Sequence, residues 1–169
     1  MRIAVTGTPG TGKTTATDLL ESRLDIVHLN EILESEELYT EVDAERESKV
    51  ADLNGLSDWL DGRDDAMIES HLAHRFEVDR VVVLRCEPES LEDRLLERGE
   101  SRAKARENAE SEALDVILAE AVEEHGLESV YEVDTTDLEP ETVADELEAV
   151  VAGDREPGAG EVEFVGYLQ

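Results

Sequence analysis

The chain has 169 residues, of which 40% are hydrophobic, and a formal net charge of −30 at pH 7. This length and apolar content predict one globular domain with a sizeable core, and the lack of a long apolar run argues against a membrane span or a signal peptide. The acidity disfavours non-specific binding to nucleic acid, and a single cysteine, Cys86, is typical of a cytoplasmic protein without disulfides.

Short apolar runs and helical patterns alternate along the chain. We expect strands at residues 2–6, 25–29, 65–69, 80–86 and 131–133. We expect helices at 13–24, from Pro88 to Gly99, at 107–125 and at 140–152, with two short helices around 31–38 and 52–61 in an acidic segment. Five strands alternating with helices predict a three-layer α/β/α domain with a five-stranded parallel sheet, covering residues 1–152. Residues 153–160 resemble a linker, and 161–169 either add an edge strand or stay mobile.

The loop after the first predicted strand carries the clearest functional signal. Gly7-Thr8-Pro9-Gly10-Thr11-Gly12-Lys13-Thr14-Thr15 fits the Walker A pattern in the strand–loop–helix context that this pattern requires. Backbone N–H groups of such a loop surround a phosphate. Lys13 can reach the β- and γ-phosphates, and the Thr14 hydroxyl can ligate Mg²⁺. The sequence therefore predicts a P-loop nucleotide-binding fold that uses ATP and Mg²⁺.

A P-loop enzyme also needs an acidic side chain at a strand end to hold Mg²⁺ or its waters. Glu69 ends the run Met67-Ile68-Glu69 and is the best candidate, while Asp134 after the last strand is the second. The alternative is that Glu69 is one more surface acid in a chain that is rich in them. Its place at a strand end favours the functional interpretation.

Basic residues are scarce in this chain but gather in one short segment. Its members are Arg94, Arg98, Arg102, Lys104 and Arg106. Arginines that close over a nucleotide stabilise the charge of the transferring phosphoryl group, so this segment is a plausible lid. We expect Arg98 or Arg102 to act in this way. The alternative is a solvated helix face on which the arginines pair with neighbouring glutamates.

Four histidines complete the candidate site residues. His71 follows Glu69 closely and could orient a phosphate acceptor or an attacking water. His28, at the end of the second strand, faces the same edge of the predicted sheet and could contact the second substrate. The spacing of His71 and His74 suggests zinc, but no further ligand completes a tetrahedral set. His125 precedes a glycine, where a helix-capping role is sufficient.

Taken together, these motifs resemble the nuclear-type adenylate kinases (adenylate kinase isoenzyme 6, the CINAP family) and their archaeal relatives. The resemblance covers about residues 1–152 and rests first on the complete nonapeptide at residues 7–15. Further matches are Glu36-Glu37-Leu38-Tyr39, Val82-Val83-Leu84-Arg85, Arg94-Leu95, Arg98-Gly99 and Asn108. The resemblance implies transfer of the ATP γ-phosphate to AMP, with slower ATP hydrolysis. It also implies a nucleoside-monophosphate-binding segment at about 28–51 and a lid at about 98–108.

The resemblance further implies roles for single residues. The ATP contacts would come from Gly10, Thr11, Gly12, Lys13, Thr14, Thr15 and Arg98. Catalysis would depend on Lys13, Glu69, His71 and Arg98, and Mg²⁺ on Thr14 and Glu69. The family's acidic-x-His motif matches Glu69-Ser70-His71, with Glu in place of the usual Asp, so ligation of Mg²⁺ could be direct or through water.

Family members also assist maturation of the small ribosomal subunit and bind a basic platform ribosomal protein. An acidic surface is compatible with such a partner. Adaptation to a salt-loving cell, in which concentrated salt screens the repulsion, explains the charge equally well. The acidity is therefore no independent support for the partner.

Several related activities compete with this interpretation. Ordinary adenylate kinases match less well because their Asp-Gly-Phe-Pro-Arg segment is absent after the third strand, and the glycine-rich acceptor motif of shikimate kinases is absent too. Cytidylate and dephospho-coenzyme A kinases fit the same architecture. The main alternative of another class is an ATP-driven ribosome assembly factor for which AMP is dispensable. A nucleotide-binding module without catalysis is the third.

Overall fold

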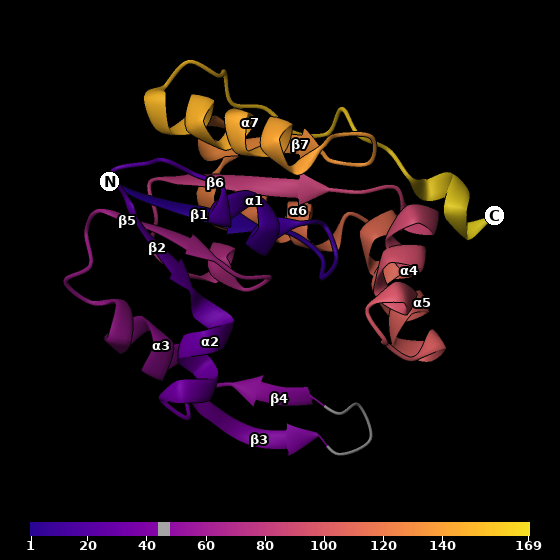
Figure 1. Cartoon of the computed structure of the whole chain (residues 1–169), viewed down its shortest axis with the longest axis horizontal. Helices are drawn as coiled ribbons and strands as arrows, with labels where there is room; N and C mark the ends of the chain where they lie inside the picture. The colour runs from indigo at the N-terminus through magenta and orange to yellow at the C-terminus, as the bar shows by residue number, and fades with distance from the viewer. Residues whose placement is uncertain (44–47) are drawn as a thin grey trace.

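The computed structural model describes residues 1–43 and 48–169. A parallel five-stranded sheet with the order β2-β5-β1-β6-β7 lies at its centre (Figure 1). The strands are β1 (Arg2–Thr6), β2 (Asp25–His28), β5 (Ala66–Glu69), β6 (Arg80–Arg85) and β7 (Val130–Asp134). The sequence-based prediction of an α/β fold with this sheet is confirmed.

Each central strand is apolar on both faces, because helices cover both sides of the sheet. Ile3 and Val5 of β1 face a core that α1 (Lys13–Asp18) and α7 (Pro140–Ala152) close. The intervening Ala4 faces the opposite core. This alternation is the two-residue period of a strand buried between two layers.

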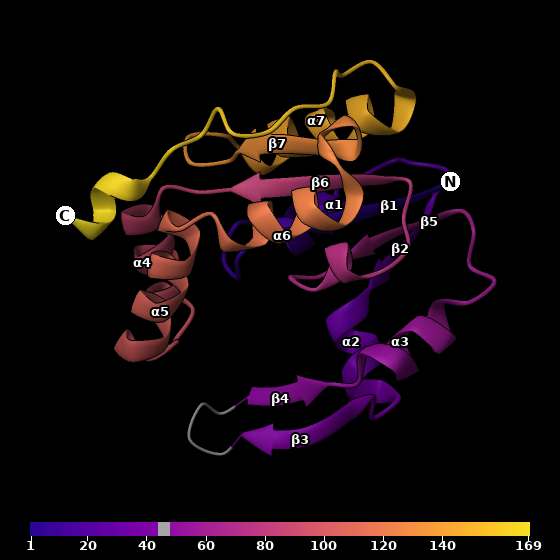
Figure 2. The same cartoon turned by 180° about the vertical axis from the view of Figure 1, so that it is seen from behind.

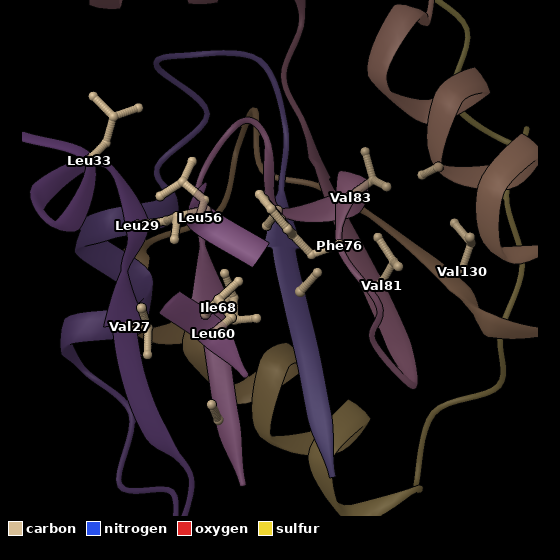
Figure 3. Close-up of a cluster of buried hydrophobic side chains, with 14 of the residues drawn as sticks. Val27, Leu29, Leu33, Leu56, Leu60, Ile68, Phe76, Val81, Val83 and Val130 are labelled. Atoms are coloured by element: carbon tan, nitrogen blue, oxygen red, sulfur yellow. The ribbon is translucent and has the colours of Figure 1, made fainter. Parts of the chain in front are cut away.

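The second core lies under α2 (Leu29–Ser35), α3 (Leu53–Leu60) and α6 (Val116–His125). Figure 3 shows its side chains converging from the strands and from these helices. The short helix η1 (Ala73–Arg75) adds Ala73 to the same cluster. The two cores hold the sheet rigidly, so that its carboxyl edge can position side chains.

The first helix is shorter than the predicted range 13–24, since α1 ends at Asp18. Thr17 donates its hydroxyl to the carbonyls of Lys13 (2.9 Å) and Thr14 (3.1 Å). Such hydroxyl bonds to the preceding turn weaken a helix, and the three threonines of this helix are poor helix formers. The chain then turns and enters β2.

The acidic segment between β2 and β5 contains the two predicted short helices and also an antiparallel hairpin that we did not predict. Its strands are β3 (Tyr39–Asp43) and β4 (Ser48–Ala51). In Figures 1 and 2 this hairpin projects away from the central sheet. Residues 44–47 of the expected monophosphate-binding segment 28–51 lie outside the described residues.

The predicted single helix 107–125 is wrong. The chain forms two helices there, α5 (Arg102–Ala113) and α6, with a break at Asp115, whereas the helix predicted from Pro88 is confirmed as α4 (Pro88–Glu97). Asp115 has a left-handed backbone, with φ of 56°, and its carboxylate pairs with buried Arg85. This ion pair compensates for a conformation that a non-glycine residue rarely adopts. The basic segment up to Arg106 is therefore helical from Arg102 onward.

The C-terminal residues neither form an edge strand nor extend freely. Gly158 makes a single parallel bridge to β7, donating its N–H to the Val130 carbonyl at 2.8 Å. The short helix η3 (Val165–Leu168) packs near α5, and the Tyr167 hydroxyl donates to Glu92 at 2.7 Å. Another short helix, η2 (Leu127–Ser129), precedes β7. Across the described residues, the structure has no helix with the length and apolarity needed to cross a membrane.

Candidate active site

The P-loop joins β1 to α1 at the carboxyl edge of the sheet. At its start, Gly7 has φ of 147°, and a Cβ atom there would lie 2.6 Å from the carbonyl oxygen of Leu84. Gly12 caps α1 with φ of 95°. Only glycine allows this close approach and this left-handed turn without strain. The glycine spacing of the motif is therefore explained by the geometry.

Three side chains from other parts of the fold hold the loop in place. Arg94 in α4 donates to the Gly10 carbonyl at 3.4 Å, and the Thr135 hydroxyl donates to the Thr11 carbonyl at 3.1 Å. The Thr8 hydroxyl donates to the carboxylate of Glu112 in α5 at 3.1 Å. Thr135 and Glu112 were not predicted, since no local sequence pattern marks a residue that contacts a loop more than a hundred positions away.

The Lys13 ammonium lies inside the loop. Its Nζ donates to the carbonyls of Gly7 (2.9 Å) and Thr8 (3.1 Å), and the residue is 8% exposed. Burial lowers the pKa of Lys13 to about 8, and Arg98 adds to this lowering, while Glu69 and Glu112 oppose it. Among the described residues, this partly desolvated ammonium has only carbonyl oxygens as hydrogen-bond partners, and it is well placed to exchange them for phosphate oxygens.

Glu69 lies at the end of β5, next to β1 in the sheet. It is 5% exposed, and its Oε2 lies 2.8 Å from Nδ1 of His28. Nε2 of the same histidine lies 3.0 Å from the Asp18 carboxylate. Burial opposes the charged form of His28, but the hydrogen bond and charge of Glu69, together with Asp18, raise its pKa. His28 therefore orients Glu69, a role that we did not predict.

The competing acid, Asp134, has another role. Its carboxylate accepts hydrogen bonds from the N–H of Thr136 at 3.0 Å and from the hydroxyl of the same residue at 2.6 Å. Asp134 is exposed and does not line the cleft. Between the two predicted acids, the geometry favours Glu69.

The donor set at the loop suits Mg²⁺. The Thr14 hydroxyl and the Glu69 carboxylate both line the same cleft, and Mg²⁺ prefers oxygen ligands of these kinds. In the described part of the chain, no three His, Cys, Asp or Glu side chains are clustered closely enough to form a ready-made metal site. Such a sparse set is usual for Mg²⁺ in nucleotide enzymes, where phosphates supply further ligands.

The histidines after β5 have different surroundings. His71 lines the cleft, and burial together with the charge of Lys13 lowers its pKa to about 4, so its ring is neutral at pH 7. His74 is buried, with Nδ1 2.8 Å from the Thr6 hydroxyl. His125 does not cap its own helix, because its Nε2 lies 2.6 Å from the His74 carbonyl oxygen.

A cleft of about 1430 Å³ opens above the loop. One wall comes from α2 and β4 and includes Asn30 and Lys49; the opposite wall comes from α4, α5 and the turn between them and includes Arg98 and Lys104. Figure 1 shows these two arms, the hairpin with α2 and the α4–α5 pair, on opposite sides of the sheet edge.

The cleft brings together most of the predicted site residues. Those that line it are Gly10, Thr11, Gly12, Lys13, Thr14, Thr15, Glu69, His71 and Arg98. Arg102 is not among them. It lines a separate hollow with Glu92 and Leu96, and Arg106 pairs with Glu110 at 3.1 Å. Of the two arginines that we expected to act, only Arg98 lines the cleft.

Comparisons with known proteins show the family of the chain. A family model described as an AAA domain matches residues 3–115. A "Putative adenylate kinase" from Natronomonas pharaonis is 60% identical, over 99% of this chain and 100% of the relative, and one from Halobacterium salinarum is 56% identical over the same shares. The chain belongs to this family, with an AAA domain at residues 3–115. A further member of the family, from Methanosarcina acetivorans, is 44% identical over 89% of this chain and 86% of its own.

Solved structures show the same fold. A shikimate kinase from Bacteroides thetaiotaomicron superimposes with a TM-score of 0.53 at 17% identity, covering 90% of this chain and 98% of its own. A sulfotransferase from Alicyclobacillus acidocaldarius gives 0.51 at 14% identity, covering 95% and 85%. These likenesses concern the fold alone. Together with the family, the P-loop fold supports a nucleotide kinase.

Proposed function

We propose that the chain is an ATP:AMP phosphotransferase of the isoenzyme 6 type, which transfers the ATP γ-phosphate to AMP with Mg²⁺. The observation that carries this proposal is one cleft in which the P-loop with Lys13 faces a second wall that is suited to an acceptor. The names of the relatives support adenylate as the substrate class. ATP and AMP are metabolites of the cytoplasm, which is the compartment we propose.

On the donor side, the loop amides and Lys13 would bind the β- and γ-phosphates of ATP. Arg98, at the C-terminal end of α4, would approach the γ-phosphate from the opposite wall. Phosphoryl transfer spreads negative charge over the equatorial oxygens, and positioned cations stabilise that charge most effectively where water is excluded. Closure of the α4–α5 pair over the loop would exclude that water.

Mg²⁺ would be held by the Thr14 hydroxyl and by Glu69, directly or through water. When bound, the ion neutralises charge on the β- and γ-phosphates. His28 would fix the Glu69 carboxylate from behind through the 2.8 Å hydrogen bond, as outer partners of metal ligands do. Neutral His71 would hydrogen-bond the acceptor phosphate or an attacking water.

On the acceptor side, Asn30, Lys49 and Leu33 line the cleft. Asn30 is oriented by the Ser70 hydroxyl, which donates to its Oδ1 at 2.9 Å. Lys49 pairs with Glu34 and lies 4.4 Å from the centre of the Tyr39 ring. An amide, a cation and an apolar side chain are the groups that a nucleoside monophosphate requires of its site.

A slower ATP hydrolysis would follow from the same machinery when water takes the place of AMP. The second candidate function, an ATP-driven factor in small ribosomal subunit maturation, has one favouring observation, the net charge of −30, which suits a basic ribosomal protein. Adaptation to concentrated salt accounts for that charge equally well.

The test is ADP formation from ATP in concentrated potassium chloride, with and without AMP. We expect AMP to raise ADP formation well above the rate with ATP alone, and CMP or UMP to raise it less. If the rate were the same with and without AMP, the phosphotransferase would be rejected. Nucleotide-dependent capture of a basic ribosomal protein would then decide for the assembly factor.

A further inference from the structure

Glu112 is a buried acid to which the roles above assign no task. It lies in α5 and is 3% exposed. Its Oε1 accepts the Thr8 hydroxyl at 3.1 Å, and its Oε2 accepts the N–H of Cys86 at 2.8 Å and Nε of Arg85 at 3.3 Å. Three segments that are distant in sequence, the P-loop, the end of β6 and α5, therefore meet at one carboxylate.

The surroundings of this carboxylate fix its orientation. Arg85 is fully buried, and its Nη2 also donates to the backbone carbonyl of Glu112 at 3.2 Å. A buried carboxylate is stable only when its oxygens are paired and hydrogen-bonded. With Oε2 occupied by Arg85 and Cys86, Oε1 is left to bind the P-loop.

The residue that Glu112 holds, Thr8, is the acceptor for several hydrogen bonds within the P-loop. The Thr8 carbonyl accepts from Nζ of Lys13 at 3.1 Å and from the hydroxyl and the N–H of Thr11 at 2.9 and 3.3 Å. Thr8 is 2% exposed, and its hydroxyl donates to Glu112. Anchoring this one residue therefore fixes both the loop backbone and the resting place of the catalytic lysine.

We propose that Glu112 is a positioning residue for ATP: from the lid helix α5 it holds the P-loop, through the Thr8 hydroxyl, in the shape that receives the triphosphate. This inference rests on the proposed function only in that ATP is the nucleotide. A loop that is already ordered has less conformational entropy to lose when ATP binds. The Thr8–Glu112 hydrogen bond is therefore expected to raise the affinity for ATP. The affinity for AMP, which would bind at the opposite wall, does not depend on this hydrogen bond.

The test compares Thr8→Val with Thr8→Ser, both as full chains. The valine variant removes the hydroxyl but leaves the Arg85 and Cys86 bonds to Glu112 in place, and circular dichroism checks that its fold is retained. The dissociation constant of ATP with Mg²⁺, measured by calorimetry, is expected to rise by about tenfold in Thr8→Val, as for loss of one hydrogen bond to a charged group. Thr8→Ser is expected to bind within about twofold of the unchanged protein.

A double-mutant cycle with Glu112→Gln assigns the effect to this pair. If Glu112 acts on ATP affinity through its bond to Thr8, the double variant loses no more affinity for ATP than the weaker-binding single variant. The KM for AMP stays unchanged in all of these variants. The matched control is Glu110→Gln, which removes an exposed carboxylate on the same helix and should leave ATP affinity unchanged. Should Glu112→Gln not fold, the valine and serine pair decides alone.

The proposal is overturned if Thr8→Val binds ATP as well as the unchanged protein does, or if Thr8→Ser binds ATP as weakly as Thr8→Val. It is also overturned if the losses of ATP affinity in Thr8→Val and Glu112→Gln multiply in the double variant. ATP affinity requires no acceptor. A protein that bound ATP but left AMP unphosphorylated would therefore contradict the proposed function while leaving this comparison intact.

Discussion

Arg85 donates Nη1 to Glu132 Oε2 at 2.6 Å, with the arginine fully buried and the glutamate 8% exposed. The same guanidinium also pairs with Glu112 and Asp115. One cation thus pairs with three carboxylates, which come from the edge strand β7, from α5 and from the break before α6. This cluster joins α5 to the sheet.

Replacing Arg85 with Met is expected to lower the free energy of unfolding by about 3–5 kcal/mol, because it leaves buried carboxylates without a partner. Urea denaturation at constant potassium chloride concentration measures the change. Arg106→Met is the matched control, since its exposed pair with Glu110 contributes at most about 1 kcal/mol. Equal losses in the two variants would contradict the structural role of the cluster.

The C-terminal segment completes this cluster from outside. The N–H groups of Gly160 and Glu161 donate to Glu132 Oε1 at 3.0 and 3.2 Å, and the Phe164 ring centre lies 5.4 Å from Arg85 Cζ. Removing residues 158–169 should cost about 1–3 kcal/mol of stability, as expected when hydrogen bonds to a buried charge are lost. Tyr167→Phe, which loses only the bond to Glu92, should cost less. A truncated chain with the unfolding midpoint of the full chain would refute this prediction.

The pH dependence of kcat/KM for ATP should report Lys13. Its pKa of about 8 lies below the usual value because of burial, so the ammonium loses its proton as pH rises through 8. Only the charged form attracts phosphate. We therefore expect kcat/KM to fall about tenfold per pH unit above 8. In the pH profile of kcat, the decrease should begin at a higher pH, because bound triphosphate favours the charged form of the Lys13 ammonium. A kcat/KM that stays flat to pH 10 would rule out this assignment.

Glu69→Gln should raise the Mg²⁺ concentration needed for half-maximal activity by at least about tenfold, since it removes a charged oxygen ligand or the group that holds the ligating water. Asp134→Asn is the matched control. It changes the other acid at the end of a strand, which does not line the cleft, and should leave the Mg²⁺ requirement as it is. A larger effect of Asp134→Asn would reverse the assignment.

The sequence predicts the parts of the site that are local. The P-loop, Lys13, Thr14 and the strand-end Glu69 follow from short motifs and strand order, and the structure brings them together in one cleft. The sheet could be predicted because parallel strands that are buried on both faces are continuous apolar runs.

The remaining features depend on contacts between distant segments. The break at Asp115 is set by its pairing with Arg85, thirty residues away, and the helical pattern of 107–125 continues through it. The hairpin of β3 and β4 lies in an acidic segment with no strong alternation. Arg98 and Arg102 lie in the same basic segment, and the sequence does not show which of them lines the cleft. The directions of α4 and α5 decide this, and only Arg98 lines it.

The most direct test of the account is the binding of a bisubstrate inhibitor in which two adenosines are joined by five phosphates. A single cleft that holds ATP and AMP together predicts one inhibitor per chain, bound at least about a hundredfold more tightly than ATP, since one linked molecule fills both subsites. Lys13→Ala should abolish this tight binding. An inhibitor that bound no more tightly than ATP, or that failed to compete with AMP, would contradict the account.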